Sequence, residues 1–402
     1  MISNLSSILS DNASGMKKSA IRELLKLIAN NEIISFAGGL PSPESFPVEK
    51  LKSIISTMMD TEPEFALQYG ATEGDILLRN ALVDMYRKQG FDIQLENLII
   101  VTASQQSLDL ISKIFLNPHD YVICELPSYL GGLQAFNSYG ANMLGVKMDS
   151  EGMSAVETEQ AILDLQKKNI KPKFIYTIPD FQNPAGTTMS LNRRKELLDI
   201  AKKYDILILE DTPYRELRYD GDHLPTIYSL DNTGYVINLG TFSKIFVPGF
   251  RIGWVIAHPD ICDKIVTAKQ SADLCTPPFT QRLAARYIEA GYFEPQLNFM
   301  INLYRKKRDA MLSSLDKYMP EGVTWTKPEG GLFLFLTCPE NINTTELFKK
   351  AIEKNVAYVI GSSFYCDGSG HNTMRLNFSY CSEEKNYEGI KRLAETIKEA
   401  MV

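Results

Sequence analysis

A lysine and an aspartate each follow shortly after a strongly apolar, β-rich run of the sequence. Lys244 follows the run at 235–240 through a turn rich in Thr and Ser, among otherwise apolar neighbours. Such a lysine can have a lowered pKa and act as a nucleophilic amine, or it can extend its ammonium to solvent. Asp211 follows the run at 206–210, where a carboxylate is costly unless it meets a cation or caps the strand end at the surface.

Two further polar segments follow β-rich runs in the same part of the chain. Ser104 and Gln105 begin a helical pattern after the run at 98–102, where free backbone N–H groups could hold a phosphate or Ser104 could simply cap the helix. Asn183 lies in a loop with two prolines and a glycine. The residue before a proline is held extended, so its amide is either aimed at a fixed point or part of an ordinary Asn-Pro turn.

Together these residue types meet the needs of a carbonyl cofactor that carries a phosphate and a pyridine nitrogen. Such a cofactor needs an amine for a Schiff base, a carboxylate that keeps the ring nitrogen protonated, donors for the ring hydroxylate and a phosphate cradle. Lys244, Asp211, Asn183 with Tyr214, and nearby Ser, Gln, Thr and Arg side chains supply them. Other templates fail, because no dinucleotide-binding G-x-G-x-x-G follows a strand-like run and neither a P-loop nor a G-x-S-x-G occurs.

The elements that must position these residues alternate between two patterns. From about 98 to 257, short β-rich runs alternate with helical segments, which predicts an α/β fold with a mostly parallel sheet covered by helices on both faces. Residues 15–30 show a helical pattern, and after about 285 a long helical pattern leads into a smaller α+β region with a short strand expected near 356–360. We expect an N-terminal arm and helix at 1–46 that packs on the small domain, a large domain at 47–290 and a small C-terminal domain at 291–402.

The composition excludes several classes of protein. Of 402 residues, 44% are hydrophobic and 23% are charged, which is typical of a globular chain. The net charge of 42 − 49 = −7 argues against a nucleic-acid partner, and no apolar run approaches the roughly 20 residues of a membrane helix. The cysteines and histidines are scattered, so we expect no metal site. The N-terminus has no secretory signal pattern, which predicts a cytoplasmic location.

Several longer motifs resemble those of fold-type I pyridoxal-phosphate enzymes, in particular class I and II aminotransferases. ISFAGGLPSPESFP, LQYGATEGDILLR, FQNPAG, EDTPY, TFSK followed by RIGW, and MRLNFS occur in the family's order. Within that family the chain is similar to the branch of 2-aminoadipate, kynurenine and multi-substrate aminotransferases. The resemblance covers residues 15–400 and implies pyridoxal 5′-phosphate (PLP) as the cofactor.

The resemblance implies a role for each matching residue around the cofactor. Lys244 would hold the Schiff base and move a proton, and Asp211 would pair with the pyridinium nitrogen. Asn183 and Tyr214 would donate to the ring oxygen, and Tyr129 would stack on the ring. The phosphate would be bound by Ser104, Gln105, Thr241 and Arg251.

The resemblance also implies how the substrate and a second subunit are bound. Arg375 would hold the substrate α-carboxylate, Gly39 would lie against the substrate, and Arg22 stands where some relatives place a second substrate arginine. Tyr69 would reach the phosphate of the neighbouring subunit, which implies a homodimer with shared active sites. The chain departs from the family pattern at Ile360, where a proline is usual, so the loop at 360–372 could alter substrate choice.

We therefore expect an aminotransferase that moves an α-amino group from an amino acid to a 2-oxo acid such as 2-oxoglutarate. The donor would be an aromatic, branched-chain or 2-aminoadipate-like amino acid. One alternative is a carbon–sulfur β-lyase that uses the same cofactor. Another is a ligand-sensing regulatory domain of the same fold, which the acidic chain and the early start of the catalytic motifs disfavour.

Overall fold

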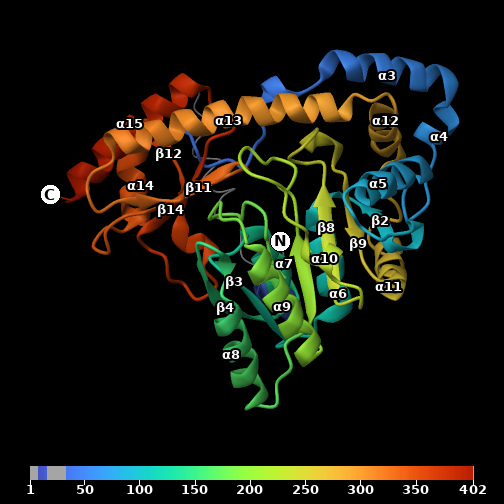
Figure 1. The fold of residues 1–402 in the computed structure, drawn as a ribbon, viewed down its shortest axis with the longest axis horizontal. Coiled ribbons are helices and arrows are strands. Elements are labelled where there is room, and N and C mark those ends of the chain that lie inside the picture. Colours follow the sequence, from blue (N-terminus) through green and yellow to red (C-terminus); the bar gives the residue numbers. More distant parts are fainter. Residues whose placement is uncertain (1–7, 16–32, 402) are drawn as a thin grey trace.

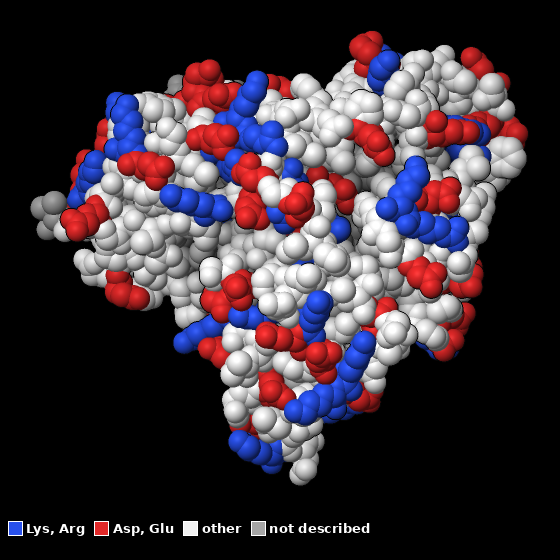
Figure 2. Space-filling view, viewed as in Figure 1, with Lys and Arg blue, Asp and Glu red and all other residues white. Residues whose placement is uncertain are grey.

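A computed structural model describes residues 8–15 and 33–401 of the chain (Figure 1). Arg22, and all but the first residue of the helix expected at 15–30, lie outside the described residues. None of the helices in the described ranges combines the length and the apolar character needed to cross a membrane. On the face drawn in Figure 2, basic and acidic side chains are interspersed rather than gathered in one patch.

An eight-stranded sheet forms the centre of the larger part of the molecule, with strand order β2-β9-β8-β7-β6-β3-β4-β5. The strands are β2 (Leu98–Val101), β3 (Tyr121–Leu126), β4 (Asn142–Asp149), β5 (Gly152–Met153), β6 (Phe174–Thr177), β7 (Leu207–Asp211), β8 (Val236–Thr241) and β9 (Gly253–Ile256). The five strands from β8 to β4 pair in parallel, whereas β9 and β5 pair antiparallel to their neighbours. The expected α/β fold with a mostly parallel sheet is confirmed.

Both faces of this sheet are apolar, because successive side chains of a strand point to opposite faces. Ile123, Ile175 and Ile208 pack into one cluster with side chains of α8 (Ala155–Gln166) and α9 (Leu191–Tyr204). The adjacent residues Cys124 and Tyr176 belong to the main core with side chains of α6 (Ala103–Phe115) and α7 (Leu130–Ser138). Buried side chains on both faces thus explain why these strands are mostly apolar rather than alternating between apolar and polar residues.

Helices at the periphery complete the larger part. They are α3 (Val48–Thr61), α4 (Pro63–Leu67), α5 (Ile76–Lys88), α10 (Ile227–Leu230), α11 (Pro259–Gln270) and α12 (Pro278–Glu289). Several begin where the sequence offers a cap: Asp75 accepts from two backbone N–H groups of α5, and Ser154 and Ser190 cap α8 and α9. A short helix, α1 (Asp11–Gly15), lies near α7.

A second, four-stranded antiparallel sheet lies at the other end of the molecule, at the left of Figure 1. Its order is β10 (Thr324–Trp325), β11 (Phe333–Thr337), β14 (Thr373–Asn377) and β13 (Val359–Ile360). The long helix α13 (Phe293–Tyr318) leads from the large part to this sheet and packs against α15 (Glu383–Met401), while α14 (Thr344–Glu353) packs between α15 and the strands. The domain boundaries at 46 and 290 stay a prediction.

The single strand expected near 356–360 is two strands that belong to different sheets. β12 (Val356–Ala357) pairs in parallel with β1 (Ile34–Ser35), whereas β13 pairs with β14. Between them Tyr358 is fully buried and donates its hydroxyl to Thr344 O at 2.6 Å. The pairing of β1 with β12 forms a separate two-stranded sheet and places the described stretch that begins at residue 33 beside α14 and α15.

Candidate active site

A cavity of about 250 Å³ opens at the carboxyl ends of the parallel strands, between β7, β8 and the start of α6. This edge is where open α/β sheets bind ligands. Eight of the residues singled out from the sequence line the cavity: Ser104, Gln105, Tyr129, Asp211, Tyr214, Thr241, Lys244 and Arg251. Two larger hollows lie elsewhere on the described surface, one beside α3 and α12 and one beside Gln89 and His223, and neither is lined by any of these residues.

Lys244 follows β8 by three residues and donates from Nζ to Gly39 O at 2.8 Å. Burial, followed by the positive charges of Arg375 and Arg251, lowers the pKa of the Lys244 amine to about 8. The lowered pKa increases the uncharged fraction of the amine near neutral pH, which makes it more nucleophilic than an ordinary lysine. The contact with Gly39 is one that the sequence did not predict, although both residues were candidates.

Asp211 is the last residue of β7 and is 1% exposed. Its Oδ2 accepts from the Tyr176 hydroxyl at 3.0 Å, whereas its Oδ1 is buried with no hydrogen-bond partner. Burial raises the pKa of the Asp211 carboxyl to about 7, against the lowering effect of Tyr176. A buried carboxylate with a free oxygen is suited to a cationic N–H donor, such as a protonated ring nitrogen.

The phosphate end of the cavity is built around the start of α6. No side chain caps this helix, the Ser104 hydroxyl is buried without a partner, and Ala103 has a positive φ of 61°. Gly253 on β9 permits the close approach, since a Cβ there would lie 2.7 Å from the Ala103 carbonyl carbon. Arg251 donates to Ser243 Oγ at 3.4 Å on the opposite side. Free helix N–H groups, hydroxyls and a guanidinium form a suitable cradle for a phosphate.

Asn183 links the cavity to the smaller sheet. Its Nδ2 donates to the Tyr214 hydroxyl at 3.1 Å, and its Oδ1 accepts from Arg375 Nη1 at 3.0 Å. Asn183 is 2% exposed and Tyr214 is 3% exposed, so these contacts are shielded from water. The amide therefore bridges a residue of the cavity and a residue of β14.

Arg375 is 2% exposed although it is a charged side chain. Its Nη2 donates to Ala37 O at 2.9 Å, and its guanidinium lies 4.1 Å from the ring centre of Phe333 and 5.1 Å from that of Phe364. Burial lowers the pKa of Arg375 to about 10, and its Nε has no hydrogen-bond partner. Within the described residues no carboxylate forms an ion pair with it, so its charge is not used in a structural ion pair there.

One of the described candidates, Tyr69, does not line the cavity of this chain. Tyr69 is 81% exposed. Arg22 lies outside the described residues. Gly39 is adjacent to the site, because a Cβ there would lie 3.3 Å from Phe333 and 4.0 Å from Lys244 Nζ.

Other residues of the site were not predicted from the sequence. Tyr176 holds Asp211, Ser243 lies between Thr241 and Arg251, and Phe333 and Phe364 enclose Arg375. Ser243 stands directly before Lys244, so its position was a usable signal. The two phenylalanines, Phe333 on β11 and Phe364 in a short 3-10 helix, carry no such signal, because aromatic residues ordinarily pack in the core.

Comparison with known proteins decides the family. The family model "Aminotransferase class I and II" matches residues 37–393. This chain belongs to that family. The aminotransferase is 50% identical to aromatic-amino-acid aminotransferase 1 of Thermococcus litoralis, over 98% of this chain and 94% of the relative. It is 39% identical to 2-aminoadipate transaminase of Thermus thermophilus, over 96% and 95%.

A solved structure extends the likeness to three dimensions. The kynurenine aminotransferase of Pyrococcus horikoshii, solved with PMP, superposes with a TM-score of 0.96 at 48% identity, over 100% of this chain and 99% of that chain. The protein is an aminotransferase whose cofactor is PLP. The free oxygen of Asp211, the free hydroxyl of Ser104 and the partly neutral amine of Lys244 fit that cofactor.

Proposed function

We propose that this aminotransferase takes the amino group from an aromatic, branched-chain or 2-aminoadipate-like amino acid and gives it to 2-oxoglutarate. The observation that carries the proposal is the buried Arg375 guanidinium, which has a free Nε and no carboxylate partner within the described residues. A planar guanidinium suits a substrate α-carboxylate, because it can donate two parallel hydrogen bonds. The names of relatives at 39–50% identity support the aromatic and 2-aminoadipate-like donors.

The residues of this chain have three tasks: they attach the cofactor, stabilise the charge on its ring nitrogen and orient the substrate. Lys244 attaches the cofactor through its amine and, once released, moves the proton at the substrate Cα. Asp211 keeps the ring nitrogen protonated through its free oxygen. Bound PLP supplies a ring that withdraws electrons from the substrate Cα. Asn183 and Tyr214 donate to the ring oxygen, and Arg375 holds the carboxylate that orients the Cα–H bond.

The remaining candidates hold the cofactor in place. Tyr129 stacks on the ring, and the phosphate is bound by Ser104, Gln105, Thr241 and Arg251. Burial of the cavity strengthens each of these contacts, since water would otherwise compete for the same donors. Gly39 leaves room for the substrate beside Lys244, and Arg22 is proposed as a second substrate arginine.

A screen of amino donors against 2-oxoglutarate tests the reaction. We expect glutamate to form in step with the oxo acid of an aromatic, branched-chain or 2-aminoadipate donor. The matched control is the same donor without an acceptor, which should give at most one turnover per site. Continuous release of pyruvate and ammonia from a cysteine-type donor without an acceptor would instead assign the carbon–sulfur β-lyase.

We also propose that the functional unit is a homodimer in which Tyr69 serves the partner's phosphate. Tyr69 is 81% exposed, and Phe65 and Leu67 beside it are 56% and 69% exposed. An aromatic and aliphatic surface of this kind is suited to burial against another subunit. A cytoplasmic location stays a prediction.

Mixing two inactive variants tests the shared site. Lys244→Ala subunits combined with Tyr69→Phe subunits should regain part of the activity, because one of the two hybrid sites then has both residues intact. Each variant mixed with itself is the control. A fully active monomer in sedimentation would contradict the proposal.

A further inference from the structure

Glu125 is a fully buried carboxylate at the end of β3 that none of the roles above uses. Its Oε1 accepts from the Thr177 hydroxyl at 2.5 Å and from Ile178 N at 3.1 Å. Its Oε2 accepts from Gln182 Nε2 at 2.8 Å. Burying a carboxylate is costly, so its partners show what the carboxylate holds in place.

Gln182 connects Glu125 to the loop that contains Asn183. Its Nε2 also donates to Pro127 O at 2.9 Å, and its Oε1 accepts from Ala185 N at 2.7 Å. The Gln182 side chain is fully buried, and its bond from Ala185 N reaches across the Asn183–Pro184 step. The position of Asn183 therefore depends on the Gln182 amide, which in turn depends on Glu125.

Asn183 binds both the Tyr214 hydroxyl and Arg375. We propose that Glu125 is a positioning residue: by holding Gln182 it fixes Asn183 toward the cofactor ring oxygen and Arg375 toward the substrate carboxylate. This inference rests on the proposed roles of Asn183 and Arg375.

A second buried carboxylate provides an internal comparison. Glu210 on β7 is also fully buried, and it accepts from Ile227 N at 2.7 Å, Tyr228 N at 3.0 Å and Asn238 Nδ2 at 3.0 Å. These partners lead to the start of α10 and to β8, away from the cavity lining. Glu125 and Glu210 thus have similar burial and similar hydrogen bonding, but only Glu125 is connected to Asn183.

The charge of Glu125 decides whether it can hold Gln182. Burial raises the pKa of the Glu125 carboxyl to about 7, against the lowering effects of its hydrogen bonds from Thr177, Gln182 and Ile178. The titratable groups that interact with it are Asp211 on β7, Tyr176 on β6 and the adjacent Cys124. A proton on Oε2 would face the Gln182 amide with a donor instead of an acceptor, so Gln182 is held best above pH 7.

Glu125→Gln removes the charge while keeping the shape of the side chain. Its new NH₂ group either replaces Oε2 and faces the donating Gln182 amide, or replaces Oε1 and faces the Thr177 hydroxyl and the donating Ile178 N–H, so in either orientation one N–H donor loses its acceptor. Glu210→Gln is the matched control, since it makes the same change in a carboxylate with no path to Asn183. Gln182→Met breaks the same connection without changing the buried charge.

The experiment compares these holoenzymes with the wild type by three measurements. Borohydride should attach the cofactor to Lys244 in every variant. Failure of attachment would contradict the proposed function, whereas the inference about Glu125 is tested by the other two measurements. Glu125→Gln should shift the pH midpoint of the bound cofactor's visible absorbance, because Asn183 no longer donates correctly to the ring oxygen. Above pH 7 it should lower kcat/KM on the order of 10- to 100-fold, the cost of a misplaced catalytic contact.

The ratio of wild-type to Glu125→Gln kcat/KM should grow as pH rises through about 7, because below that pH the wild-type side chain is also neutral. The double variant Glu125→Gln with Gln182→Met should lose little more kcat/KM than either single variant, since both changes break the same connection. Glu210→Gln should leave the absorbance midpoint at its wild-type value, and the ratio of wild-type to Glu210→Gln kcat/KM should not change with pH. Equal behaviour of Glu125→Gln and Glu210→Gln in both measurements would overturn the inference and leave Glu125 a structural residue.

Discussion

The two halves of the site are built in different ways. The half that we propose binds the cofactor consists of residues at the ends of β7 and β8 and at the start of α6, which share one edge of the large sheet. The half that we propose binds the substrate consists of Arg375 in the interior of β14, enclosed by Phe333 on β11 and by Phe364. The position of the cofactor half therefore follows from where the strands end, whereas the position of the substrate half depends on how the small sheet lies against the large one.

The halves also differ in charge. The cofactor half contains an acid and an amine whose pKa values burial moves to about 7 and about 8, for Asp211 and Lys244 respectively. The substrate half contains a buried cation alone, with Asn183 and Ala37 O as its neutral partners. We infer that the first half is suited to exchanging protons and the second to fixing an anion.

Lys244→Ala should have the largest effect, because it removes the only amine that lines the cavity among the described residues. We expect turnover to fall below detection and borohydride to leave no cofactor attached to the chain. Mass spectrometry of the reduced wild-type protein should find the adduct on Lys244. An adduct on another lysine would reject this assignment of the cofactor half.

Asp211→Asn should lower kcat on the order of 100- to 1,000-fold, since a neutral amide cannot hold a protonated ring nitrogen. The effect should fall on kcat more than on KM, because the substrate carboxylate is held in the other half. Steady-state kinetics with a saturating cofactor measures this. A variant with near-normal kcat would show that another group performs the task.

Arg375→Ala should lower kcat/KM by roughly 30- to several-thousand-fold, the cost of a buried two-point contact to an anion. The absorbance of the bound cofactor should be unchanged, which separates the two halves. Arg375→Lys should recover little, because an ammonium cannot make two parallel hydrogen bonds. Unchanged kinetics in Arg375→Ala would move the carboxylate site elsewhere, with Arg22 the first residue to test.

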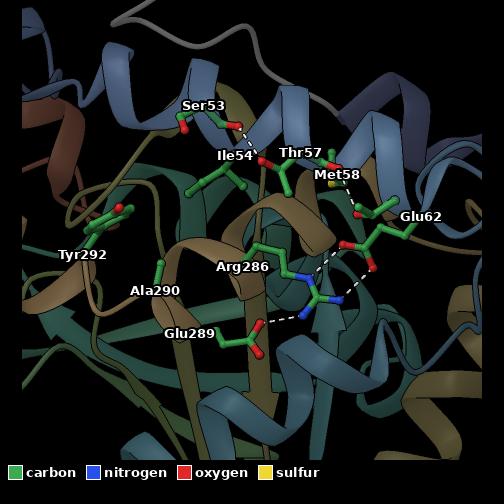
Figure 3. A pocket seen from close by; sticks show the side chains of 10 residues that line it. Ser53, Ile54, Thr57, Met58, Glu62, Arg286, Glu289, Ala290 and Tyr292 are labelled. Carbon is green, nitrogen blue, oxygen red and sulfur yellow. Dashed lines mark hydrogen bonds and ion pairs between the residues drawn. The ribbon is translucent and has the colours of Figure 1, made fainter.

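Glu62→Gln should have the smallest effect, because its ion pairs lie in a separate hollow beside α3 and α12 (Figure 3). Arg286 donates to both Glu62 oxygens, at 2.7 and 2.8 Å, and this contact holds the pKa of Glu62 below its ordinary value. The change should lower the free energy of unfolding by about 1–2 kcal/mol at pH 7. It should leave kcat/KM unchanged, because neither half of the site is touched.

The pH dependence of that loss follows from the direction of the pKa shift. A lowered pKa in the folded state gives stability that is present above the ordinary pKa of 4.5 and is lost as pH falls through the folded value. The difference between wild-type and Glu62→Gln apoprotein should therefore shrink in acid. Denaturant unfolding at pH 7 and at acid pH measures it, and a constant difference would contradict the ion-pair account.

Much of the fold could be predicted from hydrophobic patterning. The apolar runs at 206–210 and 235–240 became β7 and β8 with ends shifted by one residue, because strands buried on both faces must be apolar throughout. The run near 356–360 was misread as one strand, because pairing partners decide where a strand belongs. Its halves pair with β1 and β14, which lie far apart in the sequence.

The sequence by itself determined which side chains stand at strand ends, and hence that Lys244, Asp211 and Ser104 would meet at one edge of a sheet. Parallel strands make this a local property, since their carboxyl ends share that edge whatever their order. Only the tertiary structure decided that Asn183 binds Arg375, that Phe333 and Phe364 enclose it, and that Glu125 holds Gln182. These contacts join residues from different sheets or strands, so they depend on register and docking rather than on spacing along the chain.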